Sequence, residues 1–170
     1  CIGNHIMCGT GKPKTCYQGT IESGSDEYVL SNDNMYAEVI CDSIGAHVRS
    51  ENLKIAYKCK GANKIMLITD YCSDGDSLGS DINIINGELY GSRLTMNIAC
   101  RNMKKHTKIG MVEIFKMASL TPAKALGFDK VGRIEKDCYA DLVICDKQFN
   151  TYAVIKNGDF IKNNLNVYNS

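Results

Sequence analysis

The segment that decides the fold class is MYAEVICDSIGAHVRSENLKIAYKCKGANKIMLITD, residues 35–70. Two apolar runs within it, residues 35–42 and 64–70, have the length and composition of buried strands. Between them, residues 50–61 carry apolar side chains at helical spacing and end on glycine, which commonly follows a helix. A strand, a helix and a second strand in this order predict a parallel pair, so we expect an α/β fold.

The rest of the chain is predicted to add a turn, several helices and a β-rich end. A short alternating run at residues 81–87 ends on Asn86-Gly87, a strong turn signal. Helical patterns follow at residues 93–105, 110–120 and 121–128. Residues 131–165 then contain three short strand-like runs, which we expect to form a topologically separate part.

Composition limits the partners that this chain could have. Its 170 residues suit one ordinary domain, and 44% hydrophobic with 23% charged residues is typical of a soluble globular protein. A net charge of +1 without a basic stripe argues against binding to nucleic acid or to an anionic membrane. No apolar run approaches the roughly 20 residues of a membrane span, and the first residues do not resemble a signal peptide.

The nine cysteines form no CxxC pair, and they are scattered, with Cys41, Cys59, Cys100 and Cys145 in apolar stretches. We therefore expect reduced thiols in a cytoplasmic protein rather than a disulfide framework. Residue 1 is a cysteine, and no capping signal or linker precedes the first apolar piece. For this reason we expect the chain to begin inside a longer protein.

Three candidate functional side chains follow predicted strands: His5, His47 and Asp70. In a βα barrel the carboxyl ends of the strands meet at one mouth, where catalytic groups lie. Histidine is a common zinc ligand, and a carboxylate beside a metal can take a proton from bound water. The structural alternative is a hydrogen-bonded internal histidine and a turn-forming aspartate. The pattern alone leaves both interpretations open.

Two glycine-containing segments could offer backbone N–H groups to an anion, GTGKPKT at residues 9–15 and GSRLT at residues 91–95. The first lacks the spacing of a nucleotide phosphate loop, so nucleotide binding is not expected. Lys12 and Lys14 could contact a sugar phosphate, and an ordinary exposed turn is the competing interpretation.

A series of segments resembles the N-acetylglucosamine-6-phosphate deacetylases of the amidohydrolase superfamily. The family patterns DGIHVHP…AYKAKG, LVTDA, DGTLAGSxLTM, xTxNPAKxLGL and KGSIxxGKDADLVVLD are matched, in order, by AEVICDSIGAHVRSENLKIAYKCKG (37–61), KIMLITD (64–70), NGELYGSRLTM (86–96), MASLTPAKALGF (117–128) and VGRIEKDCYADLVICD (131–146). YAVIKNGDFI, residues 152–161, resembles the closing strands of that family. The order and spacing hold from about residue 35 to residue 162, and the series is more specific than any single segment.

This resemblance implies the C-terminal part of a (β/α)8 barrel over residues 1–130 and closing strands of a small β-sandwich over residues 131–170. It implies metal-dependent hydrolysis of the N-acetyl group of N-acetylglucosamine 6-phosphate, which yields glucosamine 6-phosphate and acetate. A divalent ion such as zinc or iron would polarise the amide and activate a water, with Asp70 as the catalytic base. His5 corresponds to a metal-ligand histidine, and His47 to a histidine that contacts the substrate.

The resemblance and the glycine-containing segments together give a wider set of expected substrate contacts: His47, Cys8, Gly9, Lys12, Lys14, Gly91 and Ser92. Cys8 and Gly9 stand where the family has Asn and Ala, and the family's phosphate-binding arginine has no counterpart. Gly45-Ala46 looks like an insertion before His47. The family's metal-binding glutamate and a further metal histidine correspond to positions upstream of residue 1.

The implied partners are an amino-sugar phosphate substrate and, in the full-length form, a second copy in a homodimer, with no nucleic acid and no membrane. Two other functions stay open. The chain could be a catalytically incomplete fragment or divergent remnant of such a hydrolase, without the upstream metal ligands. It could also be a binding module for a phosphosugar or a small nucleic acid.

Overall fold

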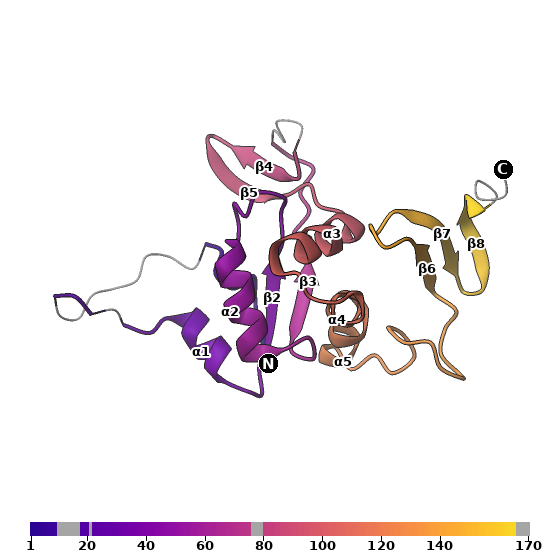
Figure 1. The fold of residues 1–170 in the computed structure, drawn as a ribbon, viewed down its shortest axis with the longest axis horizontal. Helices are drawn as coiled ribbons and strands as arrows, with labels where there is room; N and C mark the ends of the chain where they lie inside the picture. Colours follow the sequence, from indigo (N-terminus) through magenta and orange to yellow (C-terminus); the bar gives the residue numbers. More distant parts are fainter. Residues whose placement is uncertain (10–17, 21, 76–79, 166–170) are drawn as a thin grey trace.

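Figure 1 shows the fold of the chain in a computed structural model. The parts of the chain that the structure describes are residues 1–9, 18–20, 22–75 and 80–165. In these parts the strands form one parallel sheet and two antiparallel sheets, with helices packed beside the parallel one, so the predicted mixed α/β class is confirmed. None of the helices in these ranges has the length and apolar content that crossing a membrane requires.

The parallel sheet has the order β1 (Ile2–Gly3), β2 (Tyr36–Ile40) and β3 (Ile65–Ile68). Helix α2 (Ser50–Lys60) connects β2 to β3, which confirms the strand–helix–strand unit predicted for residues 35–70. Strands β2 and β3 bury apolar side chains on both faces, Val39 and Ile40 in β2 and Ile65 and Met66 in β3, as expected for a parallel sheet that is covered by other elements. The three carboxyl ends therefore lie at one edge of the sheet.

Helices cover this sheet and bury most of the core. Helix α1 (Ser25–Ser31) lies beside β1 and α2, and helix α3 (Met96–Thr107) contacts α2 and β3. The main cluster of buried side chains joins β2 and β3 to α2, to α3 and to the helical residues 111–120, and it includes Val39, Leu53, Ile65, Leu67, Met103, Ile114 and Met117. Burial of such side chains stabilises the fold by about 25 cal/mol per Å² of apolar surface removed from water. This cluster therefore holds the helices against the sheet.

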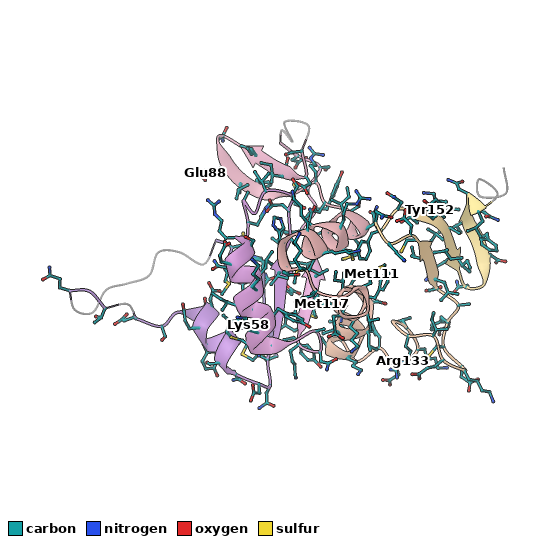
Figure 2. The ribbon with its side chains drawn as sticks, in the orientation of Figure 1. Lys58, Glu88, Met111, Met117, Arg133 and Tyr152 are labelled. Atoms are coloured by element: carbon teal, nitrogen blue, oxygen red, sulfur yellow. The ribbon has the colours of Figure 1, made fainter. Side chains whose placement is uncertain are left out.

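After α3 the chain forms a single helical stretch rather than the two separate helices predicted. Helix α4 (Met111–Phe115), the π-helical segment η1 (Lys116–Leu120) and helix α5 (Thr121–Ala125) follow without a break. Pro122 has no N–H to donate to the preceding turn, and a π-helical segment accommodates such an interruption. The fully buried Met117 of η1, labelled in Figure 2, belongs to the main core cluster.

A two-stranded hairpin, β4 (Ile82–Ile85) and β5 (Glu88–Ser92), lies above the parallel sheet in Figure 1. Asn86 and Gly87 form its turn with φ of 53° and 82°, which confirms the predicted turn. Ser92, the last residue of β5, pairs in parallel with Tyr71, which follows β3. The hairpin is therefore joined to the carboxyl end of the parallel sheet.

The C-terminal region forms its own antiparallel sheet, with the order β6 (Leu142–Cys145), β7 (Thr151–Lys156) and β8 (Asp159–Asn163). The three predicted strand-like runs are confirmed, and Figure 1 shows this sheet to one side of the helices. The domain boundary at residue 130, and the assignment of the two parts to a barrel and a β-sandwich, stay predictions.

Candidate functional site

The segment after β2 is organised around one buried carboxylate, Asp42, which has no exposed surface. Its Oδ1 accepts hydrogen bonds from the backbone N–H groups of Ile44 and Ala46, at 3.0 and 2.9 Å. Its Oδ2 accepts from the backbone N–H of His47 at 2.8 Å and from Nδ1 of the His47 ring at 3.0 Å. Asp42 therefore closes the segment between β2 and α2 into a compact loop that carries His47.

Charge pairing sets the protonation of these two side chains. Burial alone would raise the pKa of Asp42, but the hydrogen bonds from His47 and from backbone N–H groups hold that pKa below its ordinary value. Burial would lower the pKa of His47, but its bonds to Asp42 and to the Gly91 carbonyl, with the nearby charge of Asp70, raise it. The geometry therefore favours a carboxylate beside an imidazolium.

A second polar network, centred on Asp81 and Asn102, holds the segment that follows β2. Asp81 accepts hydrogen bonds from the backbone N–H and hydroxyl of Ser43, at 2.8 and 2.7 Å, and from Asn102 Nδ2 at 2.8 Å. Asn102 also donates to the Cys41 carbonyl at 3.0 Å, and His106 Nε2 bonds the Asp42 carbonyl at 2.9 Å. Sequence reasoning missed this network, because no local pattern pairs Asp81 with residues 38 positions earlier and 21 positions later.

Asp70 follows β3 and is exposed, with a left-handed φ of 49°. Its backbone carbonyl accepts a hydrogen bond from the Ser92 N–H at 2.7 Å, and Cys72 N–H donates back to the Ser92 carbonyl at 2.9 Å. The Ser92 hydroxyl donates to the Thr69 carbonyl. A Cβ at Gly91 would lie 2.7 Å from the Asp70 carbonyl, so only glycine fits there. The structure thus brings together Asp70, Gly91 and Ser92, and their roles in catalysis and substrate binding stay predictions.

His5 lies in a tight turn after β1, in which Met7 and Gly9 also have positive φ. The ring nitrogen Nδ1 of His5 lies 3.0 Å from the Cys8 carbonyl. If Nδ1 donates there, Nε2 keeps its lone pair, which is the usual arrangement of a metal-ligand histidine. The pKa of the Cys8 thiol is raised by burial and by the charges of Asp70 and Asp42. The turn after β1 is therefore in electrostatic reach of the segments after β2 and β3.

Two limits apply to the predicted site. Lys12 and Lys14 lie outside the described residues. Among the residues that are described, no group of three or more His, Cys, Asp or Glu side chains could hold a metal ion. His5 therefore fits a metal as one ligand, and the described part of the chain does not complete a coordination shell.

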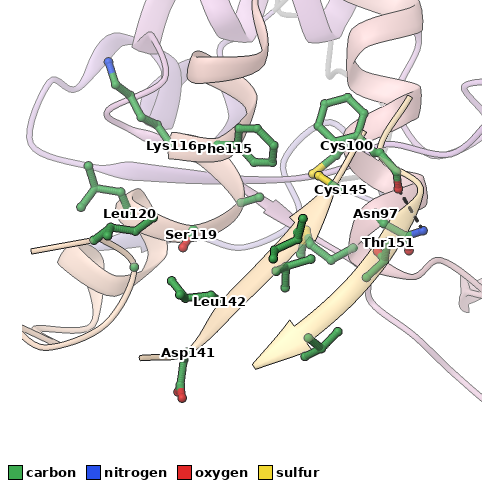
Figure 3. Close-up of a pocket in the computed structure, with 18 of the residues that line it drawn as sticks. Asn97, Cys100, Phe115, Lys116, Ser119, Leu120, Asp141, Leu142, Cys145 and Thr151 are labelled. Carbon is green, nitrogen blue, oxygen red and sulfur yellow. Dashed lines mark hydrogen bonds between the residues drawn. The ribbon is translucent and has the colours of Figure 1, made fainter. Parts of the chain in front are cut away.

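A hollow lies elsewhere, between the helices and the C-terminal sheet. It has a volume of about 860 Å³ and is lined by α3, α4, η1, β6 and β7. Figure 3 shows Phe115 and Leu142 on facing walls, with Asn97 bonded to the Phe149 carbonyl at its end. None of its lining residues belongs to the predicted site, and its walls are mainly apolar, so we assign it no chemical step.

Comparison with known proteins identifies the family. A family model described as "Amidohydrolase family" matches residues 16–163. The chain belongs to the amidohydrolase family. This assignment confirms the superfamily that the sequence motifs indicated, and it agrees with the position of the polar residues at the carboxyl edge of a parallel sheet.

Relatives of this amidohydrolase chain carry deacetylase names. It is 35% identical over 144 residues to the N-acetylglucosamine-6-phosphate deacetylase of Lysinibacillus sphaericus, across 76% of this chain and 37% of the relative. It is 30% identical over 159 residues to a putative N-acetylgalactosamine-6-phosphate deacetylase of Escherichia coli K12, across 82% of this chain and 93% of the relative. The predicted resemblance to these deacetylases is confirmed.

A solved structure gives the same result. The N-acetylglucosamine-6-phosphate deacetylase of Thermotoga maritima superposes on the amidohydrolase chain with a TM-score of 0.72 at 33% identity. The match covers 82% of this chain and 42% of that structure. The chain therefore spans less than half of the length of the first curated relatives that it matches, 37% in the Lysinibacillus protein and 41% in that of Haemophilus influenzae.

Proposed function

We propose that this chain forms the C-terminal part of an enzyme that removes the N-acetyl group from an amino-sugar 6-phosphate. The proposed substrate is N-acetylglucosamine 6-phosphate, and the products are glucosamine 6-phosphate and acetate. One observation carries the proposal. At the carboxyl edge of the parallel sheet, backbone hydrogen bonds connect Asp70 to Ser92, and His47 bonds the adjacent Gly91, in a chain of the amidohydrolase family. The names of its relatives support the substrate class.

Asp70 is the proposed catalytic base. Its exposed carboxylate follows β3, and general base catalysis requires a group that can reach the attacking water. In the proposed reaction Asp70 accepts a proton from the water that attacks the amide carbon, and then donates it to the departing amine. When bound, a divalent metal such as zinc or iron supplies Lewis-acid polarisation of the amide carbonyl, with His5 as one ligand.

The remaining predicted residues are proposed to surround the sugar phosphate. Cys8 and Gly9 lie in the turn after β1, and Gly91 and Ser92 lie at the end of β5. A substrate contact by His47 would require opening of its hydrogen bond to Gly91, because both ring nitrogens are engaged inside the protein. The proposed full-length enzyme is cytoplasmic and forms a homodimer.

A second candidate is a catalytically incomplete fragment or divergent remnant of such a hydrolase. Two observations favour it: the described residues contain no group of three or more His, Cys, Asp or Glu side chains that could hold a metal, and the match covers 37% of a relative. In that case this chain would bind no metal and release no acetate, whereas a longer protein that contains it could do both.

The test measures acetate release from N-acetylglucosamine 6-phosphate and from N-acetylgalactosamine 6-phosphate, with the metal content of the same sample. It uses this chain and a longer protein that contains it. In an active protein, Asp70→Asn should lower kcat by about 10²- to 10⁴-fold, the usual contribution of a catalytic base, and keep the metal. His5→Ala should lower the metal content as well as the rate.

The matched control is Asp74→Asn, which changes an exposed acid in the same loop and should leave the rate unchanged. Equal rates for the wild type and Asp70→Asn would contradict the proposed mechanism. Absence of turnover in this chain with turnover in the longer protein would support the fragment interpretation. Absence of turnover in both would refute the deacetylase proposal.

A further inference from the structure

His47 is held by two groups that can only accept hydrogen bonds. Nδ1 lies 3.0 Å from Asp42 Oδ2, and Nε2 lies 3.0 Å from the Gly91 carbonyl oxygen. A neutral imidazole has one N–H and cannot donate to both. The His47 side chain is 2% exposed, so water does not replace either partner. Three backbone N–H groups, of Ile44, Ala46 and His47, also donate to Asp42 and hold it as a carboxylate without a proton to give. With Asp42 in this state, both bonds form together only if the ring carries two protons.

Gly91, whose carbonyl bonds the His47 ring, is connected to Asp70 through its neighbour Ser92. Gly91 precedes Ser92, whose N–H donates to the Asp70 carbonyl at 2.7 Å and whose carbonyl accepts from Cys72 N–H at 2.9 Å. Gly91 also packs against the Asp70 carbonyl so closely that a Cβ could not be inserted. A shift of the Gly91–Ser92 segment would therefore move the backbone on both sides of Asp70.

We propose that His47 is a positioning residue: as an imidazolium held by Asp42, it anchors the Gly91 carbonyl and, through Ser92, fixes the backbone of Asp70. The catalytic importance of this link rests on the proposed function, whereas the link itself does not. It differs from a substrate contact, because both ring nitrogens act on the protein. The chain of bonds runs from the buried carboxylate after β2 to the exposed carboxylate after β3.

The charges around the ring are consistent with this state. Asp42 bonds it directly, and the charge of Asp70 adds to its attraction for a proton. The other titratable groups of the surrounding elements bond neighbouring residues and not the His47 ring itself. His106 and Lys105 of α3 bond the carbonyls of Asp42 and Ser43, Asp81 bonds Ser43, and Arg93 after β5 bonds the carbonyls of Ser73 and Gly75.

The first test is nuclear magnetic resonance of the ¹⁵N-labelled chain as it exists. At pH 6, the proposal expects both His47 ring nitrogens to be protonated, and hydrogen exchange of the Ser92 and Cys72 amides to be slow. As the pH rises and the ring loses a proton, these two amides should exchange at least tenfold faster relative to Ala37, whose N–H bonds the Lys64 carbonyl in the sheet. This measurement needs no variant.

The second test compares His47→Gln with His106→Gln at pH 6. Glutamine at position 47 is neutral, so exchange at Ser92 and Cys72 should rise at least tenfold relative to Ala37. His106 also bonds the Asp42 residue, but not Gly91, so its variant should change that ratio less than threefold. In an active longer protein, His47→Gln should lower kcat at least tenfold with KM within threefold, whereas a lost substrate contact would chiefly raise KM.

A neutral His47 ring at pH 6 would overturn the proposal. So would unchanged relative exchange of Ser92 and Cys72, either in His47→Gln or across the pH titration. If neither this chain nor the longer protein releases acetate, the proposed function fails, and the exchange data still decide the role of His47.

Discussion

Replacing the buried Asp42 by asparagine is the most direct test of the hydrogen bonds that hold the loop after β2. The substitution keeps the size of the side chain but removes its charge and turns one oxygen into an NH2 group. Each carboxylate oxygen of Asp42 now accepts two hydrogen bonds, one pair from Ile44 and Ala46 and the other from His47. In either orientation, the new NH2 group faces two N–H donors, which lose their acceptor in a site without exposed surface.

The expected cost follows from these contacts. A hydrogen bond to a charged group contributes about 1.5–3 kcal/mol, and breaking a buried ion pair costs about 3–5 kcal/mol. The two figures describe the same interactions and are not added, so we expect Asp42→Asn to lower the free energy of unfolding by about 3–5 kcal/mol. Since domains are stable by about 5–15 kcal/mol, this is a large part of the total.

The effect should also depend on pH, with a sign that the two pKa shifts determine. The lowered pKa of Asp42 stabilises the fold above its ordinary value of 3.8, and this contribution is lost as the pH falls through the folded-state pKa. The raised pKa of His47 stabilises the fold below its ordinary value of 6.5, and this is lost as the pH rises through the folded-state pKa. The difference between wild type and variant should be largest between these two ordinary values.

Urea unfolding at a series of pH values measures this difference, provided that the m-value stays constant. Asp146→Asn is the matched control, because Asp146 also accepts four hydrogen bonds, from Gln148, Asn150 and Tyr152. Water can reach that more open loop and replace the lost acceptor, so its variant should lose less stability. A loss at Asp42 below about 1 kcal/mol, or no larger than the loss at Asp146, would refute the reasoning.

Two further substitutions test packing near the site and below it. Gly91→Ala should lower the urea midpoint of unfolding more than Gly127→Ala. Both glycines have positive φ, which costs a non-glycine residue about 1–2 kcal/mol. Only at position 91 would the added Cβ also lie 2.7 Å from a backbone atom, the Asp70 carbonyl oxygen. Equal losses would show that this close approach carries no strain. Thr121→Val should cost about 1–3 kcal/mol, because the buried Thr121 hydroxyl donates to the Ala62 carbonyl at 2.6 Å. An unchanged midpoint would mean that another donor replaces it.

Much of the fold could be predicted from local patterns, because those patterns reflect local physics. The apolar runs of β2 and β3 and the glycine after α2 specify a strand–helix–strand unit through burial and backbone geometry. The same patterns placed Asp70 at the carboxyl end of a strand. The predicted break between the helices at residues 110–120 and 121–128 was wrong, because α4, η1 and α5 follow one another without a break and the Thr121 hydroxyl bonds the distant Ala62 carbonyl.

The site itself depends on contacts that no local pattern encodes. Gly91 lies 44 positions after His47, and Asn102 lies 21 positions after Asp81. Which of these groups meet is decided by how the hairpin and α3 pack on the sheet edge. Sequence reasoning could therefore nominate the histidine, but not the ring's two acceptors or its burial.

Gly45 and Ala46, the two residues that look inserted before His47, show how this packing accommodates a longer loop. Gly45 takes a φ of 72°, with a Cβ position only 3.3 Å from the Val48 carbonyl, and Ala46 donates its N–H to Asp42. Because the carboxylate accepts the backbone N–H groups of the longer loop, the loop folds inward around Asp42 instead of extending into solvent. His47 consequently remains against Gly91, so the loop that contains Gly45 and Ala46 is also the loop that ties β2 to the backbone of Asp70.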